Sequence, residues 1–149
     1  MPPPPMDRRG GSDPPETAVS GKMTKRELTE YIFDTYSVEA DHPFKMDDVS
    51  SVFRHPDNRK WFALTMKIPY RTLGITRDGN VDILNVKCDP ILIGSLRGKP
   101  GILPAYHMNK DKWSTLLLDG SVERGDIEAL LAMSYELTAA RPRRIGGGR

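Results

Sequence analysis

A polar stretch within residues 105–120 carries the side chains of this sequence that are best suited to recognising a ligand. His107 and Asn109 can donate and accept hydrogen bonds, and Lys110 and Lys112 carry positive charge. Groups of these types bind phosphate oxygens and read the edges of nucleic-acid bases. The pattern is compatible with an anion site or a nucleic-acid contact, although spacing alone favours an ordinary surface loop.

Two further cations lie upstream, in the Gly- and Pro-rich connection at 97–101. This connection leads directly into the polar stretch, so Arg97 and Lys99 could converge with Lys110 and Lys112 in space. Anion binding is one interpretation of such a cluster. Charge that only keeps a loop solvated explains the same residues equally well.

Patterns typical of catalytic and metal sites are absent. The sequence contains no G-x-x-x-x-G-K-[ST], G-x-G-x-x-G or H-E-x-x-H motif, and its single cysteine cannot form a zinc pair. Cys88 and His107 could act as nucleophile and base, but nothing places a third group to orient them, and a buried small residue is the simpler interpretation of Cys88. Glu27, Glu30 and Asp34 fit a solvated helix face better than a cation site. We therefore predict no catalytic residue, no metal site and no cofactor.

Helical periodicity appears near both ends of the chain. Thr24 and Glu27 form the T-x-x-E pattern of a capping box, ahead of apolar residues on one face: Leu28, Tyr31, Ile32 and Tyr36. A second helix ends before Arg141-Pro142, and its buried face is predicted to contain Ile127, Leu130, Leu131, Ser134, Tyr135 and Thr138. These helices should cover whatever sheet lies between them.

The middle of the chain reads as a series of strands. Alternating apolar and polar residues predict strands at 49–54, 61–68, 72–76, 81–87 and 113–118. Within 61–68, the alternation assigns one face to Phe62, Leu64, Met66 and Ile68. Asp89-Pro90 predicts the start of a short helix over 91–96. Tight turns between successive strands imply antiparallel pairing.

The predicted fold class is α+β, a two-layer sandwich in which an antiparallel sheet of about five strands is backed by the N- and C-terminal helices. Residues 1–22 are rich in Pro and Gly and should be a disordered tail, residues 23–140 form one domain, and 141–149 form a flexible Arg- and Gly-rich tail. The domain is large enough for one hydrophobic core.

Charge is distributed unevenly along the chain. The formal net charge is +2, but residues 45–112 alone carry twelve basic and seven acidic side chains. A nucleic acid should therefore meet the sheet and its loops rather than the more acidic terminal helices. The single cysteine, the lack of a long apolar run and the lack of a secretory signal predict a cytoplasmic protein without membrane contact.

Several segments resemble the MmcQ/YjbR family of small bacterial proteins. They are Lys-Trp-Phe-Ala-Leu at 60–64, Asn-Val-Lys-Cys-Asp-Pro at 85–90, the run from Pro100 to Lys110, and the run from Trp113 to Ser121. The most specific of these features is H-x-N-K-x-x-W at 107–113. The resemblance extends over about 24–140 and leaves the Pro-rich extension and the Arg/Gly tail unexplained.

The resemblance implies a frataxin-like two-layer domain and DNA binding, a function attributed to the family through similarity to a double-wing DNA-binding fold. We therefore predict a non-enzymatic nucleic-acid-binding protein, with DNA as the expected nucleic acid. In this hypothesis, cations contact phosphates, two polar side chains contact bases or the sugar-phosphate backbone, and Trp113 supports the loop. The candidate binding residues are Lys110, Lys112, His107, Asn109, Arg97 and Lys99.

The alternative is a protein-interaction or small-ligand-binding module that uses the same loop without touching nucleic acid. A basic protein partner would suit the acidic helical faces, which contain Glu27, Glu30, Asp34, Asp126 and Glu128. An enzyme that uses Cys88 is a third hypothesis. A monomer is the expected oligomeric state.

Overall fold

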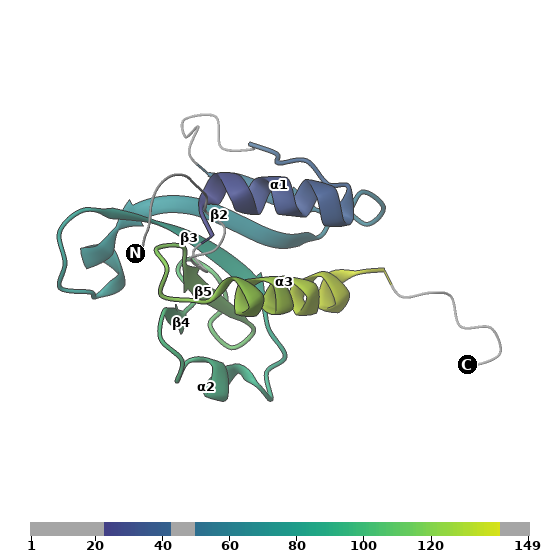
Figure 1. Cartoon of the computed structure of the whole chain (residues 1–149). Helices are drawn as coiled ribbons and strands as arrows, with labels where there is room; N and C mark the ends of the chain where they lie inside the picture. The colour runs from purple at the N-terminus through teal and green to yellow at the C-terminus, as the bar shows by residue number, and fades with distance from the viewer. Residues whose placement is uncertain (1–22, 43–49, 141–149) are drawn as a thin grey trace, which may run out of the picture.

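The computed structural model describes residues 23–42 and 50–140, so the tails predicted at 1–22 and 141–149 lie outside the described residues. A five-stranded antiparallel sheet is covered on one face by two helices, which confirms the predicted α+β sandwich (Figure 1). The strand order is β1-β2-β3-β5-β4. The strands are β1 (Ser51–Arg54), β2 (Trp61–Pro69), β3 (Asn80–Lys87), β4 (Ile102–Pro104) and β5 (Trp113–Leu117).

Helix α1 (Lys25–Tyr36) begins where the sequence predicts it. The Thr24 hydroxyl accepts the Glu27 backbone N–H, and the Glu27 carboxylate accepts the Thr24 N–H, both at 3.1 Å. This reciprocal pair is the predicted capping box, and it satisfies backbone donors that the first turn leaves unpaired. Leu28 and Ile32 are fully buried beneath the helix, as their spacing indicates.

Helix α3 (Arg124–Thr138) is the longer of the two covering helices, and its predicted apolar face is confirmed. Five residues of that face are buried: Ile127, Leu130, Leu131, Ser134 and Thr138. The Ser134 hydroxyl donates to the Phe62 carbonyl at 2.6 Å and accepts the Lys87 N–H at 2.8 Å, so it ties α3 to β2 and β3. No helix in the described part of the chain is long and apolar enough to cross a membrane.

One contiguous apolar cluster fills the space between the two helices and the sheet. Both helices and all five strands contribute to it, and its largest fully buried side chains include Leu28, Phe53, Phe62, Leu84, Ile102, Leu116 and Leu131. A fully buried side chain of this size contributes about 1.5–3 kcal/mol through its removal from water. This cluster is therefore the main source of the domain's stability.

The predicted face assignment in β2 is wrong at Phe62. The pairing register shifts between Phe53 and Arg54, because Phe53 pairs with Ala63 whereas Arg54 pairs with Trp61. Phe62 is the extra residue, and such a β-bulge turns it toward the helices instead of leaving it on the face of Met66. Strict alternation fails here because the extra residue of a bulge reverses which residues face the helices before and after it.

The segment at 72–76 is not a strand, contrary to the sequence prediction. A short 3-10 helix, η2 (Tyr70–Leu73), follows β2 directly, and Gly74 after it has φ 80°. The Tyr70 N–H donates to the Gly79 carbonyl, and the Tyr70 carbonyl accepts the Ile75 N–H. The connection between β2 and β3 is therefore closed by turn hydrogen bonds. Local backbone hydrogen bonds thus replace the sheet pairing that the β-branched residues suggested.

The fifth strand comes instead from β4, which the sequence did not reveal. Before it, the predicted helix at 91–96 is reduced to α2 (Ile93–Leu96), because Asp89 caps a turn at the Ile91 N–H rather than the helix itself. At Gly101, φ is 80° and an added Cβ would lie 2.6 Å from the Cβ of Ser121. Only glycine fits this approach of β4 to the segment after β5.

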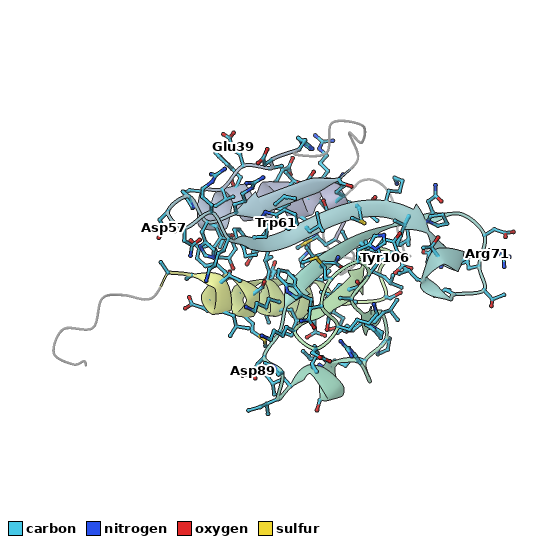
Figure 2. The ribbon with its side chains drawn as sticks, turned by 180° about the vertical axis from the view of Figure 1, so that it is seen from behind. Glu39, Asp57, Trp61, Arg71, Asp89 and Tyr106 are labelled. Atoms are coloured by element: carbon cyan, nitrogen blue, oxygen red, sulfur yellow. The ribbon has the colours of Figure 1, made fainter. Side chains whose placement is uncertain are left out.

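The second face of the sheet, turned away from α1 and α3, is called the open face below. It carries a smaller apolar cluster in which Tyr70, Ile83 and Leu117 are buried and Tyr106 is partly buried. Figure 2 views the molecule from this side, with Trp61 and Tyr106 labelled over the strands. The 3-10 helix η2 and loops pack against this cluster, and neither α1 nor α3 covers it.

Candidate functional site

The loop at 105–112 joins β4 to β5 and is anchored on the open face by a buried polar network. The Thr115 hydroxyl accepts the Tyr106 N–H at 2.9 Å and donates to the Asn85 side-chain oxygen at 2.5 Å. The Asn85 amide in turn donates to the Tyr106 carbonyl at 3.0 Å. Asn85 and Thr115 are both fully buried. Because every member has a partner, the network holds the loop at a defined height above the strands.

Asn109 organises the second half of this loop. Its carbonyl accepts the N–H groups of Lys112 and Trp113, at 3.1 and 2.9 Å. Its side-chain oxygen accepts the N–H of Asp111 at 2.8 Å, which is the hydrogen bond of an Asx turn. The oxygen of this predicted binding residue is therefore used within the loop, while the side chain as a whole is exposed.

Arg97 lies against the loop, as the sequence predicted for the upstream cations, but its guanidinium is hydrogen-bonded to the loop backbone. Its Nη2 donates to the backbone carbonyl of Lys110 and, at 3.2 Å, to that of Trp113. These bonds clamp the loop to the connection after α2. Arg97 therefore acts on the geometry of the loop.

Three lysines of the candidate set are exposed: Lys99, Lys110 and Lys112. Among the residues that the structure describes, none of them has a carboxylate within ion-pair distance. The backbone near two of them is fixed, since the Lys112 carbonyl accepts the Cys88 N–H at 2.7 Å and Arg97 holds the Lys110 carbonyl. Lys110 and Lys112 thus present ammonium groups on a backbone held by hydrogen bonds, and Lys99 lies on the connection that Arg97 joins to the loop.

His107 lies on the exposed side of the loop with a left-handed backbone, φ 61°. Its ring centroid is 4.0 Å from that of Tyr106, and the two rings are tilted by 43°. A positive φ is uncommon for a residue other than glycine. His107 is therefore held in a turn and packed against Tyr106, with its side chain exposed.

A hollow of about 270 Å³ lies beside the loop, between η2, β4 and the loop itself. Its walls are mostly apolar, with Leu73, Leu103 and Tyr106 among them, and Lys110 is the charged residue at its rim. A lysine at the edge of an apolar pocket can bind an acid group while the walls contact an apolar body. This hollow was not expected from the sequence, because Leu73 was assigned to a strand.

The Cys88 thiol is fully buried at the end of β3, as the sequence indicated. Burial raises its pKa, which outweighs smaller opposing effects of Ser114 and Arg97. A thiol with a raised pKa is a poor nucleophile at neutral pH. His107, the base considered for it, is exposed on the loop.

Apart from Asp111, which is exposed between Lys110 and Lys112, the acidic groups lie outside the loop. Hydrogen bonding from the Thr24 backbone, aided by Arg124, lowers the pKa of Glu27 against the effect of burial, and the Arg124 guanidinium lies 3.1 Å from its carboxylate. Within 23–42 and 50–140, no three His, Cys, Asp or Glu side chains are grouped so as to hold a metal ion. Glu27 thus serves capping and ion pairing, and Glu30 forms an ion pair with Arg26.

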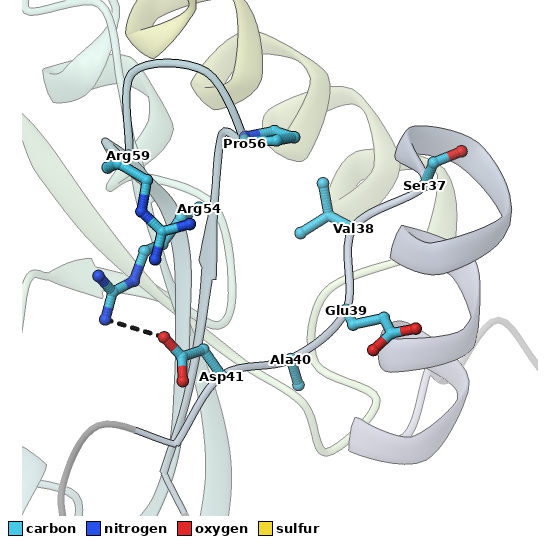
Figure 3. Close-up of a pocket in the computed structure, with 8 residues that line it drawn as sticks. All are labelled: Ser37, Val38, Glu39, Ala40, Asp41, Arg54, Pro56 and Arg59. Atoms are coloured by element: carbon cyan, nitrogen blue, oxygen red, sulfur yellow. Dashed lines mark ion pairs between the residues drawn. The ribbon is translucent and has the colours of Figure 1, made fainter.

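A second, polar hollow of about 440 Å³ lies between the segment after α1 and the turn that joins β1 to β2. Figure 3 shows Arg54 and Arg59 on one side of it and Asp41 on the segment opposite, with the ion pair between Arg54 and Asp41 at 2.9 Å. Arg59 has φ 66°. Charged residues of both signs line this hollow, among them Glu39, Asp41 and Arg59.

Sequence reasoning missed Asn85 and Thr115, which position the candidate loop. A signal was present: Asn85 lies between Leu84 and Val86 inside the strand, and asparagine is depleted in strands. A polar residue at a buried position implies a hydrogen-bond partner. The identity of that partner could not be read from spacing, because Tyr106 and Thr115 are distant in the sequence.

The comparisons with known proteins agree with this architecture. The family model described as YjbR matches residues 33–137. The uncharacterized protein YyaQ of Bacillus subtilis (strain 168) is 33% identical over 116 residues, which cover 78% of this chain and 98% of that protein. A crystal structure of a Pseudomonas syringae protein is 44% identical with a TM-score of 0.77, and the match covers 78% of this chain and 100% of that one.

A more distant solved structure extends the similarity. A Deinococcus radiodurans protein is 27% identical with a TM-score of 0.61, and the match covers 87% of this chain and 96% of that one. The range matched by the family model runs from the last part of α1 to the last turn of α3. It therefore includes the whole open face and the candidate loop.

Proposed function

The chain belongs to the YjbR family, and from that premise we propose that it binds nucleic acid, DNA in the first instance, without catalysing a reaction. The observation that supports this most directly is the group of exposed lysines Lys99, Lys110 and Lys112, which have no carboxylate partner among the described residues. Unpaired ammonium groups on a fixed backbone are the chemistry that contacts phosphates. We also propose that the two-layer domain has the frataxin-like fold that the family resemblance implies.

The six candidate residues take different roles in this proposal. Lys99, Lys110 and Lys112 contact phosphate oxygens, and His107 supplies a ring nitrogen that can bond a base or a phosphate. Arg97 and Asn109 chiefly hold the loop, because the guanidinium and the side-chain oxygen already bond within it. The amide nitrogen of Asn109 remains suited to a base contact.

The test is a salt titration of affinity. Binding of a fluorescently labelled duplex, measured by anisotropy, should weaken steeply as salt rises, because each phosphate contact releases counterions. Lys110→Ala with Lys112→Ala should weaken binding and make the slope of log K against log[salt] shallower by about 2, roughly one for each lysine removed.

The matched control removes the same charge from the other side of the molecule. Lys25→Ala with Arg26→Ala lies on α1, on the helix-covered face, so binding and slope should stay close to those of the unmodified protein. Equal effects of the two double variants would show that only net charge matters. A salt-independent affinity would rule out a phosphate-contacting loop.

The hollow beside Lys110 favours a second function, a small-ligand module. Its apolar walls and single ammonium group suit a small carboxylic acid with an apolar body. NMR titration with hexanoate should then shift the amide signals of Leu73 and Leu103, and hexanol should not. The nucleic-acid function is favoured if the shifts with hexanoate are no larger than those with hexanol. It is also favoured if duplex DNA does not affect hexanoate binding and the lysine variants lose DNA binding alone.

A further inference from the structure

Two tryptophans and two cations form a row across one end of the open face. In the sheet register, Arg54 of β1 pairs with Trp61 of β2, and Lys87 of β3 pairs with Trp113 of β5. The end of β1, the start of β2, the end of β3 and the start of β5 all lie at the same end of an antiparallel sheet. The row Arg54, Trp61, Lys87 and Trp113 therefore crosses four adjacent strands.

Strand alternation and burial place this row on the open face. Ile83 and Leu117 belong to the open-face cluster, and Lys87 and Trp113 fall at even spacing from them along β3 and β5. Phe53 belongs to the helix-side cluster, so its neighbour Arg54 and the paired Trp61 take the opposite face. Figure 2 shows Trp61 from this side.

Charge along the row is of one sign. The charged residues within the five strands are Arg54, Lys67, Asp82 and Lys87, and the only carboxylate, Asp82, pairs with Lys67 at 3.3 Å on the helix side. Lys87 has no ion-pair partner among the residues that the structure describes. Arg54 is paired with Asp41 at the hollow of Figure 3, and it also lies over the Trp61 ring at 6.0 Å.

The row continues directly into the candidate loop. Trp113 is the first residue of β5 and follows Lys112, while Arg97 holds the Trp113 carbonyl. Both indoles are partly exposed. With neighbouring strands about 4.8 Å apart, the row extends the cationic loop across about 14 Å of sheet. A ligand that contacts the loop can therefore reach both rings.

Aromatic side chains beside cations recognise unpaired bases. In a single strand each base exposes a π-face that can stack on an indole, and its phosphates remain available to lysine and arginine. A duplex keeps its bases stacked on one another and offers no such face. The alternation of cation and tryptophan along the row matches the alternation of phosphate and base in one strand.

We propose that the row Arg54, Trp61, Lys87 and Trp113 is a stacking surface for single-stranded nucleic acid, continuous with the lysines of the loop. This inference rests on the proposed nucleic-acid function and specifies its ligand. It also gives Trp113 a contact role in addition to the support of the loop expected from the sequence.

The tryptophans themselves report the test, since the chain contains only these two. Trp61→Phe and Trp113→Phe each leave one indole, and an aromatic replacement preserves the fold. An oligothymidylate of about twelve nucleotides, a length within the range of single-strand sites, should quench the fluorescence of both single-tryptophan proteins. Anisotropy of the same labelled oligonucleotide measures binding independently, and an adenine-thymine duplex of equal length is the comparison.

Affinity provides the second readout. Trp61→Ala and Trp113→Ala, checked for folding by circular dichroism, should each weaken oligothymidylate binding by about five- to 150-fold, the range found for loss of one stacked base. Duplex binding should change little. Tyr31→Ala, on α1 at the helix-covered face, is the control aromatic substitution.

The outcomes separate the inference from the function on which it rests. Quenching of both indoles with tighter binding of the single strand supports the stacking surface. Binding seen by anisotropy without quenching of both indoles, or with preference for the duplex, overturns the stacking surface and leaves the lysine loop intact. No binding of either nucleic acid overturns both proposals.

Discussion

The two faces of the sheet are built by different means. Toward α1 and α3, a large apolar cluster excludes water, and buried hydroxyls such as those of Ser134 and Thr138 are hydrogen-bonded beside it. On the open face, a small cluster of five buried residues is joined by the hydrogen-bonded pair Asn85 and Thr115, and a loop takes the place of a helix. Apolar burial therefore contributes most to the first face, while hydrogen bonds position the loop on the second.

This difference shows where the protein can carry a binding site. A loop held by directional bonds keeps polar groups at defined positions while leaving their outer sides exposed. A helix packed by apolar contacts cannot do so without exposing its core. The candidate loop and the tryptophan row both lie on the open face, where hydrogen bonds hold the loop in place and only a small apolar area is buried.

The largest contrast should come from two adjacent residues on opposite faces. Phe62→Ala should lower the free energy of unfolding by about 3–5 kcal/mol, because it leaves a cavity in the helix-side cluster. Trp61→Ala should cost much less, since a partly exposed ring gives up only part of the roughly 1.5–3 kcal/mol of full burial. Urea denaturation measures both. Similar losses would mean that the bulge does not separate the two faces.

A smaller effect is expected at the polar anchor of the loop. Thr115→Val keeps the side-chain shape but removes the hydroxyl that bonds both Asn85 and Tyr106, so we expect a loss of about 1–3 kcal/mol. Hydrogen exchange at the Tyr106 amide should accelerate at the same time. Thr115→Ser should retain slow exchange, and Thr76→Val, at an exposed position, should stay within about 0.5 kcal/mol of the parent.

The smallest effect concerns acid stability at the edge of the open-face cluster. Burial acts to raise the pKa of Asp119, but hydrogen bonds from Ser121 and Tyr70 outweigh it, and the pKa lies below its usual value. The Tyr70 hydroxyl donates to this carboxylate at 2.6 Å. A lowered pKa contributes stability above the unfolded-state pKa, and that contribution is lost as pH falls through the folded-state value.

Tyr70→Phe should therefore raise the pKa of Asp119 and reduce the loss of stability between about pH 5 and about pH 2. Carboxyl NMR shifts follow the titration, and urea midpoints follow the stability. Tyr31→Phe, on the helix side, is the control. An unchanged Asp119 titration in Tyr70→Phe would show that Ser121 and the Arg77 guanidinium alone lower its pKa.

The helices could be predicted from the sequence because their signals are local. The capping box at Thr24 and the apolar spacing from Ile127 to Thr138 both act within a few residues, and both are confirmed. The segment at 72–76 could not be predicted correctly, since β-branched residues there suggest a strand while hydrogen bonds around Tyr70 form a turn. β4 is three residues long and has no periodicity to detect.

For the candidate site, the residue types around Lys110 indicated the location, and the structure changed the roles. Arg97 was expected to face an anion, but long-range contacts with the loop carbonyls determine its orientation. The row of cations and tryptophans was also beyond sequence reasoning. It depends on the pairing register and on the bulge at Phe62, and neither is encoded by spacing within one strand.

The helices that close the core lie far apart in the sequence, and this has a consequence for synthesis. Arg124 of α3 contacts Glu27 of α1 across 97 residues, and Thr138 meets His55 across 83. While the chain emerges from the ribosome, at about 5–20 residues per second, the apolar side of the sheet has no second helix to cover it. The domain should therefore fold only after α3 has left the exit tunnel, and a nascent chain stalled before Arg124 should remain a chaperone substrate.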